Sequence, residues 1–192
     1  MKKLLRSLFA GSLLVVPVFG ASFSFTSVTT GQPTFNRPTL TSGNVTTFTT
    51  QSGQSVAYSA QALNITTPGV YTFSSNVFAA SFASWNNALF LYSGSFNPTN
   101  PLANAVIGQS GGLNSNVGYS YFNYNILTSG TYILVTTGLV NGAMGTAAGL
   151  ATGPGIITAG SPVPEPGSTF LVGIGLLLAG ALRFKAKLPV FR

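Results

Sequence analysis

Very few residues of this chain could take part in chemistry. Among its 192 residues there is one acid, Glu165, and there is no His and no Cys. Ser/His and Cys/His catalysis, disulfides, and zinc or haem sites built on those ligands are therefore excluded. A single carboxylate also excludes the two-acid mechanism of glycosidases and leaves too few oxygens for Ca²⁺. The sequence predicts a protein that is not an enzyme and that uses no cofactor and no metal.

Aromatic side chains are the other residues suited to recognition. Because alternate residues of a strand share a face, Tyr119 and Tyr121 are expected to form a stripe on one strand. Such rings can pack on the C–H face of a sugar. The competing interpretation is that the aromatics fill a sandwich core and form cross-strand pairs. Sugar stacking therefore stays a hypothesis for this set: Trp85, Tyr92, Tyr119, Tyr121 and Tyr124.

The charged residues gather at the two ends of the chain. The formal net charge is +7, although only 5% of the residues are charged. Between the ends Arg37 is the only cation, and we expect its side chain to be solvated. A nucleic-acid site needs several clustered cations, so nucleic-acid binding is excluded. The remaining cations are Lys2, Lys3, Arg6, Arg183, Lys185, Lys187 and Arg192.

The first 20 residues have the three parts of a secretory signal peptide. A cationic start, MKKLLR, precedes the apolar run 8–19 and the small residues Gly20, Ala21 and Ser22. We expect signal peptidase to cut between Gly20 and Ala21, with a cut after Ser22 as the alternative. A retained N-terminal anchor is the third interpretation, because the apolar run is short but hydrophobic.

The C-terminal end combines a rigid linker, an apolar run and a basic tail. Residues 161–167 are rich in proline, which favours an extended backbone. Residues 168–182 are apolar or small, and Ser168 can cap a helix. The cations that follow favour a cytoplasmic end under the positive-inside rule. The sequence thus predicts a single transmembrane helix and basic tail over 168–192.

This tail resembles the PEP-CTERM sorting signal of exopolysaccharide-producing Gram-negative bacteria, over residues 163–187. The resemblance rests on the motif Val163, Pro164, Glu165 and Pro166, the apolar run, and the tail cations Arg183, Lys185 and Lys187. It implies cleavage near the motif by an exosortase, a membrane protease, and release or transfer of the mature chain to the surface or matrix. The cations are more spread out here than in many such tails. A plain C-terminal anchor with a proline-rich stalk is the alternative.

The middle of the chain, residues 21–160, has the pattern of a mainly β domain. In 55–62, Val56, Tyr58, Ala60 and Ala62 share one face, and the other face has Ser55, Ser59 and Gln61 with Ala57 as a neutral position. A turn is predicted at 66–69, strands at 70–75, 77–85, 88–92, 119–126 and 132–136, and a loop at 94–101. The Gly/Ala-rich segment 142–155 is predicted to be a loop or a loosely packed last strand. Short strands at regular spacing, without an amphipathic helix, predict an antiparallel β-sandwich.

Residues 68–155 also resemble the bacterial pre-peptidase C-terminal type of domain, a jelly-roll-like β-sandwich. The resemblance rests on segments 68–73, 89–92, 96–104, 129–135 and 153–155. Members of that family commonly carry acids that can serve Ca²⁺ in two places, which here read Trp85-Asn86-Asn87 and Gln109-Ser110-Gly111-Gly112. Because neither segment contains Asp, no Ca²⁺ site is expected.

These features together predict an exported protein whose precursor is held in the inner membrane by its C-terminal helix, with the sandwich in the periplasm. The predicted role of the mature chain is structural or adhesive, at the cell surface or in an exopolysaccharide matrix. Two alternatives remain open: a surface carbohydrate-binding module, and a non-catalytic accessory of a secreted hydrolase. Signal peptidase and exosortase are the expected processing partners, and exopolysaccharide is the candidate ligand.

Overall fold

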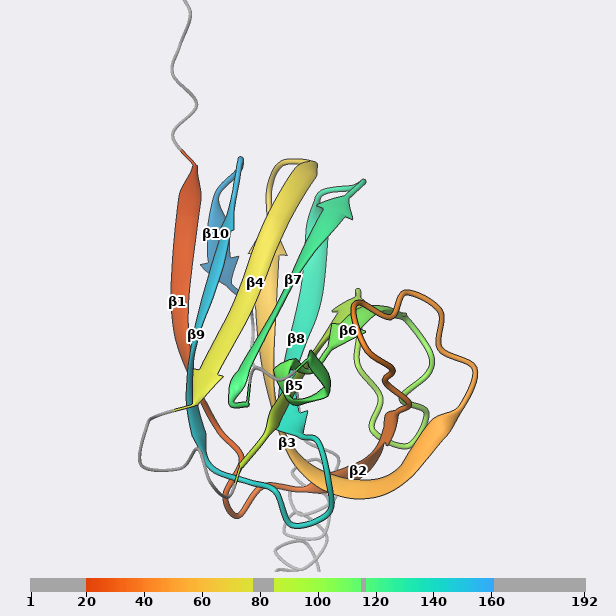
Figure 1. The fold of residues 1–192 in the computed structure, drawn as a ribbon. Helices are drawn as coiled ribbons and strands as arrows, with labels where there is room; N and C mark the ends of the chain where they lie inside the picture. Colours follow the sequence, from red (N-terminus) through yellow and green to blue (C-terminus); the bar gives the residue numbers. More distant parts are fainter. Residues whose placement is uncertain (1–19, 78–84, 115–116, 161–192) are drawn as a thin grey trace, which may run out of the picture.

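The computed structural model describes residues 20–77, 85–114 and 117–160 as a two-layered β-structure (Figure 1). The only helical element in these ranges is the short 3-10 turn η2 (Gly111–Asn114). The strands are β1 (Ala21–Val28), β2 (Thr34–Pro38), β3 (Gln51–Ile65), β4 (Gly69–Val77), β5 (Asn87–Ser93), β6 (Ala105–Gln109), β7 (Tyr119–Ile126), β8 (Gly130–Gly138), β9 (Thr146–Gly153) and β10 (Ile157–Ala159).

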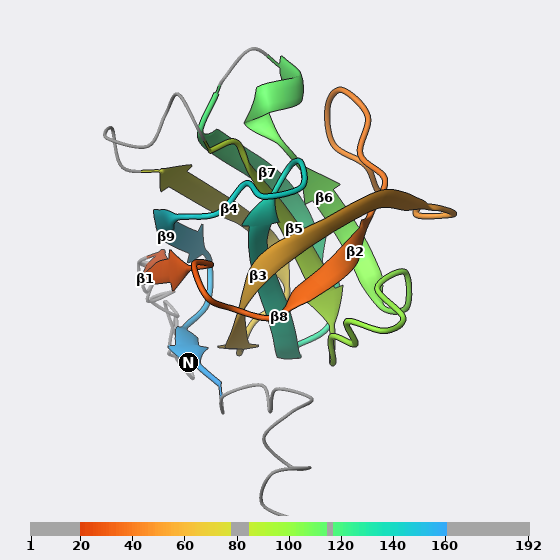
Figure 2. The same ribbon diagram turned by 90° about the horizontal axis from the view of Figure 1, so that it is seen from below.

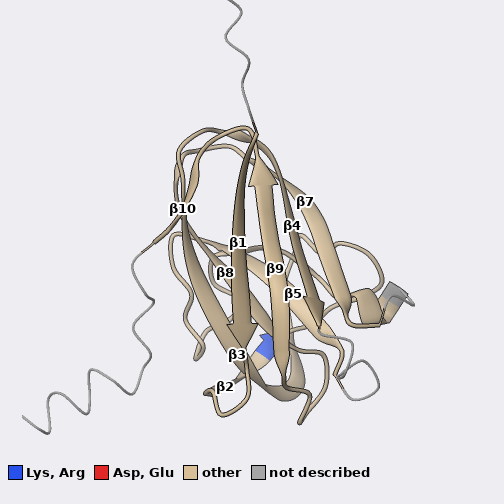
Figure 3. Ribbon diagram, turned by 90° about the vertical axis from the view of Figure 1, so that its left-hand side faces the viewer, with Lys and Arg blue, Asp and Glu red and all other residues tan. Residues whose placement is uncertain are grey.

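The strands form two antiparallel sheets that face each other. The first sheet has four strands in the order β1-β9-β4-β7. Figure 3 shows these four strands next to one another. The second has the order β10-β3-β8-β5-β6, and β2 pairs with the first half of β3. Figure 2 shows β2 and β3 alongside each other in orange. The predicted antiparallel β-sandwich is thus confirmed at the level of its two sheets.

The strand predictions are confirmed where a clear alternation or a compact apolar run marked them. The range of β7 is the predicted one, and β4, β5 and β8 enclose the predicted ranges 70–75, 88–92 and 132–136. Most of the strand predicted over 77–85, residues 78–84, lies outside the described ranges; Val77 is the last residue of β4, and Trp85 is in no strand.

The main core lies between the two sheets. Tyr71, Phe73 and Phe122 from the first sheet meet Leu89, Leu91, Leu134 and others from the second. A second cluster lies on the opposite face of the second sheet, where Phe90, Tyr92 and Val135 pack under Phe35, Leu40 and Phe96. β5 and β8 are therefore buried on both faces, which explains why residues 88–92 are continuously apolar rather than alternating.

The Gly/Ala-rich segment is neither a loop nor a loose last strand, which corrects the prediction. Residues 146–153 form β9, which pairs with β1 on one side and β4 on the other. The small residues leave space for large neighbours: a Cβ on Gly149 would overlap the Phe25 ring, and one on Gly153 would overlap the Tyr71 ring. Here small residues mark close packing against aromatics.

The predicted signal peptide, sorting motif and transmembrane helix lie outside the described residues. The part of the chain that the structure describes contains no apolar helix of membrane-spanning length.

Candidate functional site

The four-stranded sheet carries no charged residue on any of its strands (Figure 3). On the edge strand β7, side chains alternate so that Tyr119, Tyr121 and Asn123 are exposed, whereas Ser120 and Phe122 are buried. The strand register places Ser74 beside Tyr121 and Asn76 beside Tyr119. Hydroxyl and amide groups thus lie next to the two tyrosine rings, without any charged side chain.

Tyr119 and Tyr121 form an exposed aromatic pair, called the tyrosine pair below. Their rings lie 5.5 Å apart between centroids with an interplanar angle of 27°. The two side chains are 39% and 45% exposed. Each ring therefore keeps apolar surface open to solvent, the kind of surface on which a sugar ring can stack.

Buried hydrogen bonds hold the backbone under this pair. The Tyr121 N–H donates to Oε1 of Gln109 at 2.9 Å, and Gln109 is itself buried. Between the two tyrosines, the Ser120 hydroxyl points inward and donates to Asn87. Beside them, the Thr72 hydroxyl donates to Oδ1 of Asn123 at 2.7 Å. The pair therefore stands on a strand whose inner side is fixed.

Two of the other predicted stacking residues are in the interior, which corrects their assignment. Trp85 is buried in a small cluster with Val77, Ala143 and Ala147. Tyr92 is fully buried, its ring centroid lies 4.8 Å from that of Phe96, and its hydroxyl donates to the Pro101 carbonyl at 3.0 Å. Neither ring face can receive a sugar, because other side chains already cover it.

Tyr124 differs from both groups. It is half-buried and packs against the main core, and burial raises the pKa of its hydroxyl.

The predicted signal-peptidase cleavage site, Gly20 and Ala21, lies at the N-terminal end of the described residues. Gly20 is exposed, and Ala21 is the first residue of β1. Outside the described ranges lie Val163, Pro164, Glu165, Pro166, Arg183, Lys185 and Lys187.

Segments 85–87 and 109–112, the two places where the resembled family commonly carries acids, lie next to each other in the structure. The Asn87 amide donates to the Ser75 hydroxyl at 2.9 Å, and its backbone carbonyl accepts from Ser110 at 2.7 Å and Ser120 at 3.0 Å. All four side chains are buried. Uncharged groups thus join β4, β5 and β7 by bonding one another. In the described ranges there is no group of three or more His, Cys, Asp or Glu residues.

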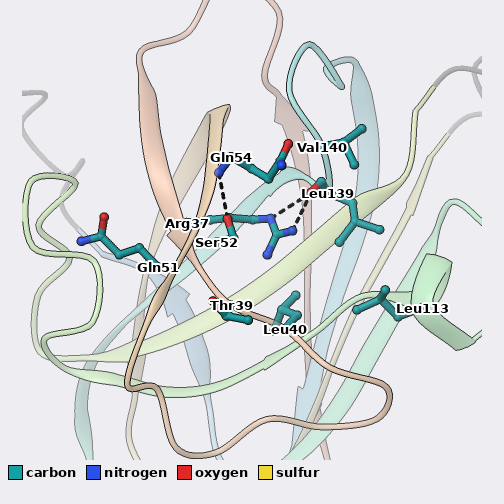
Figure 4. A pocket seen from close by; sticks show the side chains of 9 residues that line it. All are labelled: Arg37, Thr39, Leu40, Gln51, Ser52, Gln54, Leu113, Leu139 and Val140. Atoms are coloured by element: carbon teal, nitrogen blue, oxygen red, sulfur yellow. Dashed lines mark hydrogen bonds between the residues drawn. The ribbon is translucent and has the colours of Figure 1, made fainter.

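Arg37 was expected to be solvated and is instead buried, at 6% exposure. Nε and Nη2 donate to the Leu139 carbonyl at 3.0 and 2.6 Å, and Nη1 donates to the Pro38 carbonyl at 2.9 Å. Desolvation lowers the pKa of its guanidinium from the ordinary value. The side chain lines an open pocket of about 350 Å³, the Arg37 pocket, drawn in Figure 4. Sequence reasoning missed it, because an isolated Arg carries no signal of burial.

Comparisons with known proteins do not assign this chain to a family. No protein-family model and no curated protein matches it. Among solved structures, one match is "CBM35 from Cellvibrio japonicus Abf62", at 16% identity and a TM-score of 0.34, covering 73% of this chain and 99% of that one. The function must therefore be argued from this chain's own surfaces.

Proposed function

We propose that this chain is an exported, non-catalytic protein of the cell surface or extracellular matrix whose sandwich binds neutral carbohydrate. The observation that carries the proposal is the tyrosine pair, Tyr119 and Tyr121, exposed on an uncharged sheet face. Binding of matrix polysaccharide by this face would provide the structural or adhesive role.

The surroundings of the tyrosine pair suit a sugar better than a charged ligand. Sugars combine apolar C–H faces with hydroxyl groups, and the aromatic rings here have Ser74 and Asn76 as their strand neighbours. Tyr and Asn are also the residue types that binding surfaces use for apolar area and adaptable hydrogen bonds. The competing explanation is that the two rings merely stabilise an edge strand by packing on each other.

Polysaccharide binding tests the tyrosine pair directly. The intact protein should be retarded in native gels that contain a neutral polysaccharide from a panel of glucans and mannans. Replacing both tyrosines, Tyr119→Ala with Tyr121→Ala, should weaken binding by about tenfold or more, because each ring lost from a stacking site is worth on the order of 1 kcal/mol or more.

Two control variants show whether a loss of binding comes from the tyrosine rings or from a general loss of exposed apolar surface. Tyr121→Phe keeps the ring and should keep most of the retardation, whereas Leu127→Ala removes an exposed side chain from the loop after β7 and should have no effect. Unchanged binding by the double variant, with a folded circular dichroism spectrum, would rule out this face as the sugar site.

Export and sorting form the second part of the proposal, and they rest on the two ends of the sequence. The strand limits are compatible with it. A cut after Gly20 would leave β1 whole, whereas a cut after Ser22 would remove two residues that pair with Gly153 and Thr152. The last strand ends at Ala159, just before the proline-rich linker 161–167. Both proposed cleavage regions thus flank the sandwich.

Intact mass of the protein from membrane and extracellular fractions tests this sorting. The extracellular species should lack both ends, and Glu165→Ala should leave the C-terminal end attached, because the changed residue is the centre of the Pro-Glu-Pro motif. A full-length C-terminus in both samples would indicate a permanent anchor, and the matrix role would then have to be abandoned.

A further inference from the structure

Arg37 is the only charged residue in the described part of the chain, and it is buried. Arg37 belongs to β2, and in Figure 3 the described ribbon is tan apart from one blue segment. No Asp or Glu lies in the described ranges, so no acid there neutralises it. A buried charge without a counter-ion is unfavourable unless hydrogen bonds or a ligand compensate for it.

The hydrogen bonds from Arg37 to other described residues use only some of its donors. A guanidinium has five N–H donors, one on Nε and two on each terminal nitrogen. Three of them donate to the carbonyls of Leu139 and Pro38. Among the described residues, one N–H on Nη1 and one on Nη2 have no further acceptor. Two such donors, one on each prong of the fork, match the two oxygens of a carboxylate.

The pocket in front of this fork has the lining of a sugar site. Figure 4 shows Arg37 between Gln54 and Leu139 on one side and Thr39, Leu40 and Leu113 on the other. Its volume of about 350 Å³ falls in the range of small-molecule sites. Gln54 accepts the Asn141 N–H through Oε1, which leaves its amide NH₂ able to donate to a ligand. Amide and hydroxyl groups opposite leucines suit a ring that carries hydroxyls and C–H bonds.

We propose that the Arg37 pocket binds the carboxylate of an acidic sugar, a uronic acid unit of a polysaccharide. The single charge of a carboxylate balances the single charge of Arg37, whereas a phosphate dianion would need further cations that the pocket lacks. This is a second site, formed by β2, β3, η2 and the segment after β8, and it does not depend on the tyrosine pair for its chemistry.

The test uses the full-length protein and two probes that differ only in charge. An oligogalacturonate should bind, as measured by isothermal titration calorimetry, and its methyl ester should bind at least about tenfold more weakly, because the ester cannot pair with the guanidinium. The affinity for the acid should also fall as salt is raised, since the pocket is open to solvent.

Two variants locate the binding in the pocket. Leu113→Trp fills the pocket without touching the hydrogen bonds of Arg37, and it should weaken binding about tenfold or more. Its control, Leu127→Trp, makes the same change outside the pocket and should bind as the wild type does. Arg37→Lys keeps the charge but loses the fork, so it should also bind about tenfold more weakly while near-ultraviolet dichroism shows an intact fold.

The outcomes separate this site from the proposed function. The double change Tyr119→Ala with Tyr121→Ala should leave oligogalacturonate binding unaltered. Equal affinity for acid and ester, wild-type affinity in Leu113→Trp, or no binding at all would overturn the proposal.

Discussion

The seven tyrosines of this chain show how burial decides what one side-chain type can do. Tyr121 is 45% exposed and stacks on Tyr119, whereas Tyr92 is fully buried with its hydroxyl bonded to the Pro101 carbonyl. The first can meet a ligand, and the second holds the segment after β5 against the second sheet. The same side-chain type is therefore open to solvent in one place and part of the packed interior in the other.

Because Tyr92 is buried, we expect the free energy of unfolding to fall as the pH rises in the alkaline range. Desolvation raises the pKa of its hydroxyl far above the ordinary value. The folded state then keeps the proton that the unfolded chain loses, so this contribution to stability is complete below about pH 10 and is lost as the pH rises further. We expect Tyr92 to lower the free energy of unfolding by up to about 1.4 kcal/mol per pH unit above that value.

Urea unfolding between pH 8 and 11 measures this effect. Tyr92→Phe should lose about 1 kcal/mol at pH 8, the worth of a buried hydrogen bond, and should show a shallower alkaline decline. Tyr121→Phe, at an exposed position, should follow the wild type. An identical alkaline slope in Tyr92→Phe and wild type would show that other groups cause the decline.

At the scale of elements, β9 shows how small residues position large ones. The strand lies between β1 and β4, and its glycines face aromatic rings. The ring beside Gly153 cannot move aside easily, because the Tyr71 hydroxyl donates to the Thr67 carbonyl at 2.7 Å and accepts from the Gly155 N–H at 3.1 Å. The absence of a side chain at Gly153 is therefore a packing requirement.

A methyl group at Gly153 should consequently destabilise the sandwich. We expect Gly153→Ala to lower the free energy of unfolding by about 1–3 kcal/mol, the usual effect of overpacking a core. Ala148→Val adds more volume on the same strand but on the exposed face, and it should change stability by less than about 0.5 kcal/mol. Thermal unfolding of the two variants makes the comparison, and equal losses in both would argue against the ring contact.

At the scale of the whole molecule, the near-absence of charge controls association. Within the described ranges Arg37 is the only charged residue, and β1 and β7 are the two edges of the first sheet. Edge strands without charged residues tend to pair with other chains, and a neutral surface provides little repulsion. Such behaviour is a liability for a dilute enzyme and suits a protein embedded in a matrix.

We therefore expect the protein to self-associate as its concentration rises, through its sheet edges. Ser24→Lys with Thr26→Lys adds two charges to exposed positions of β1 and should shift the chain towards the monomer in sedimentation velocity. The control, Thr46→Lys with Thr47→Lys, adds the same charge to the exposed loop before β3. Equal effects of both pairs would assign the change to net charge, and a monomeric wild type at high concentration would contradict the prediction.

Much of this protein was determined by its sequence alone. The chain has no His, no Cys and a single acid, and no arrangement in space can supply side chains that the chain lacks. Alternation and turn residues were sufficient to predict strands such as β7, because a strand's period is a local property of the backbone. The exposure of both Tyr119 and Tyr121 on one side of β7 follows from the same period.

Only the tertiary structure decided what covers each face. Tyr92 and Trp85 could not be distinguished from Tyr121 by sequence, because alternation says which residues share a side and not whether another layer packs on it. The burial of Arg37 depends on the Leu139 carbonyl, 102 residues away in the chain. The central place of β9 likewise depends on rings from β1 and β4. These are long-range contacts, and they decide which of the chain's few distinctive residues can bind a ligand.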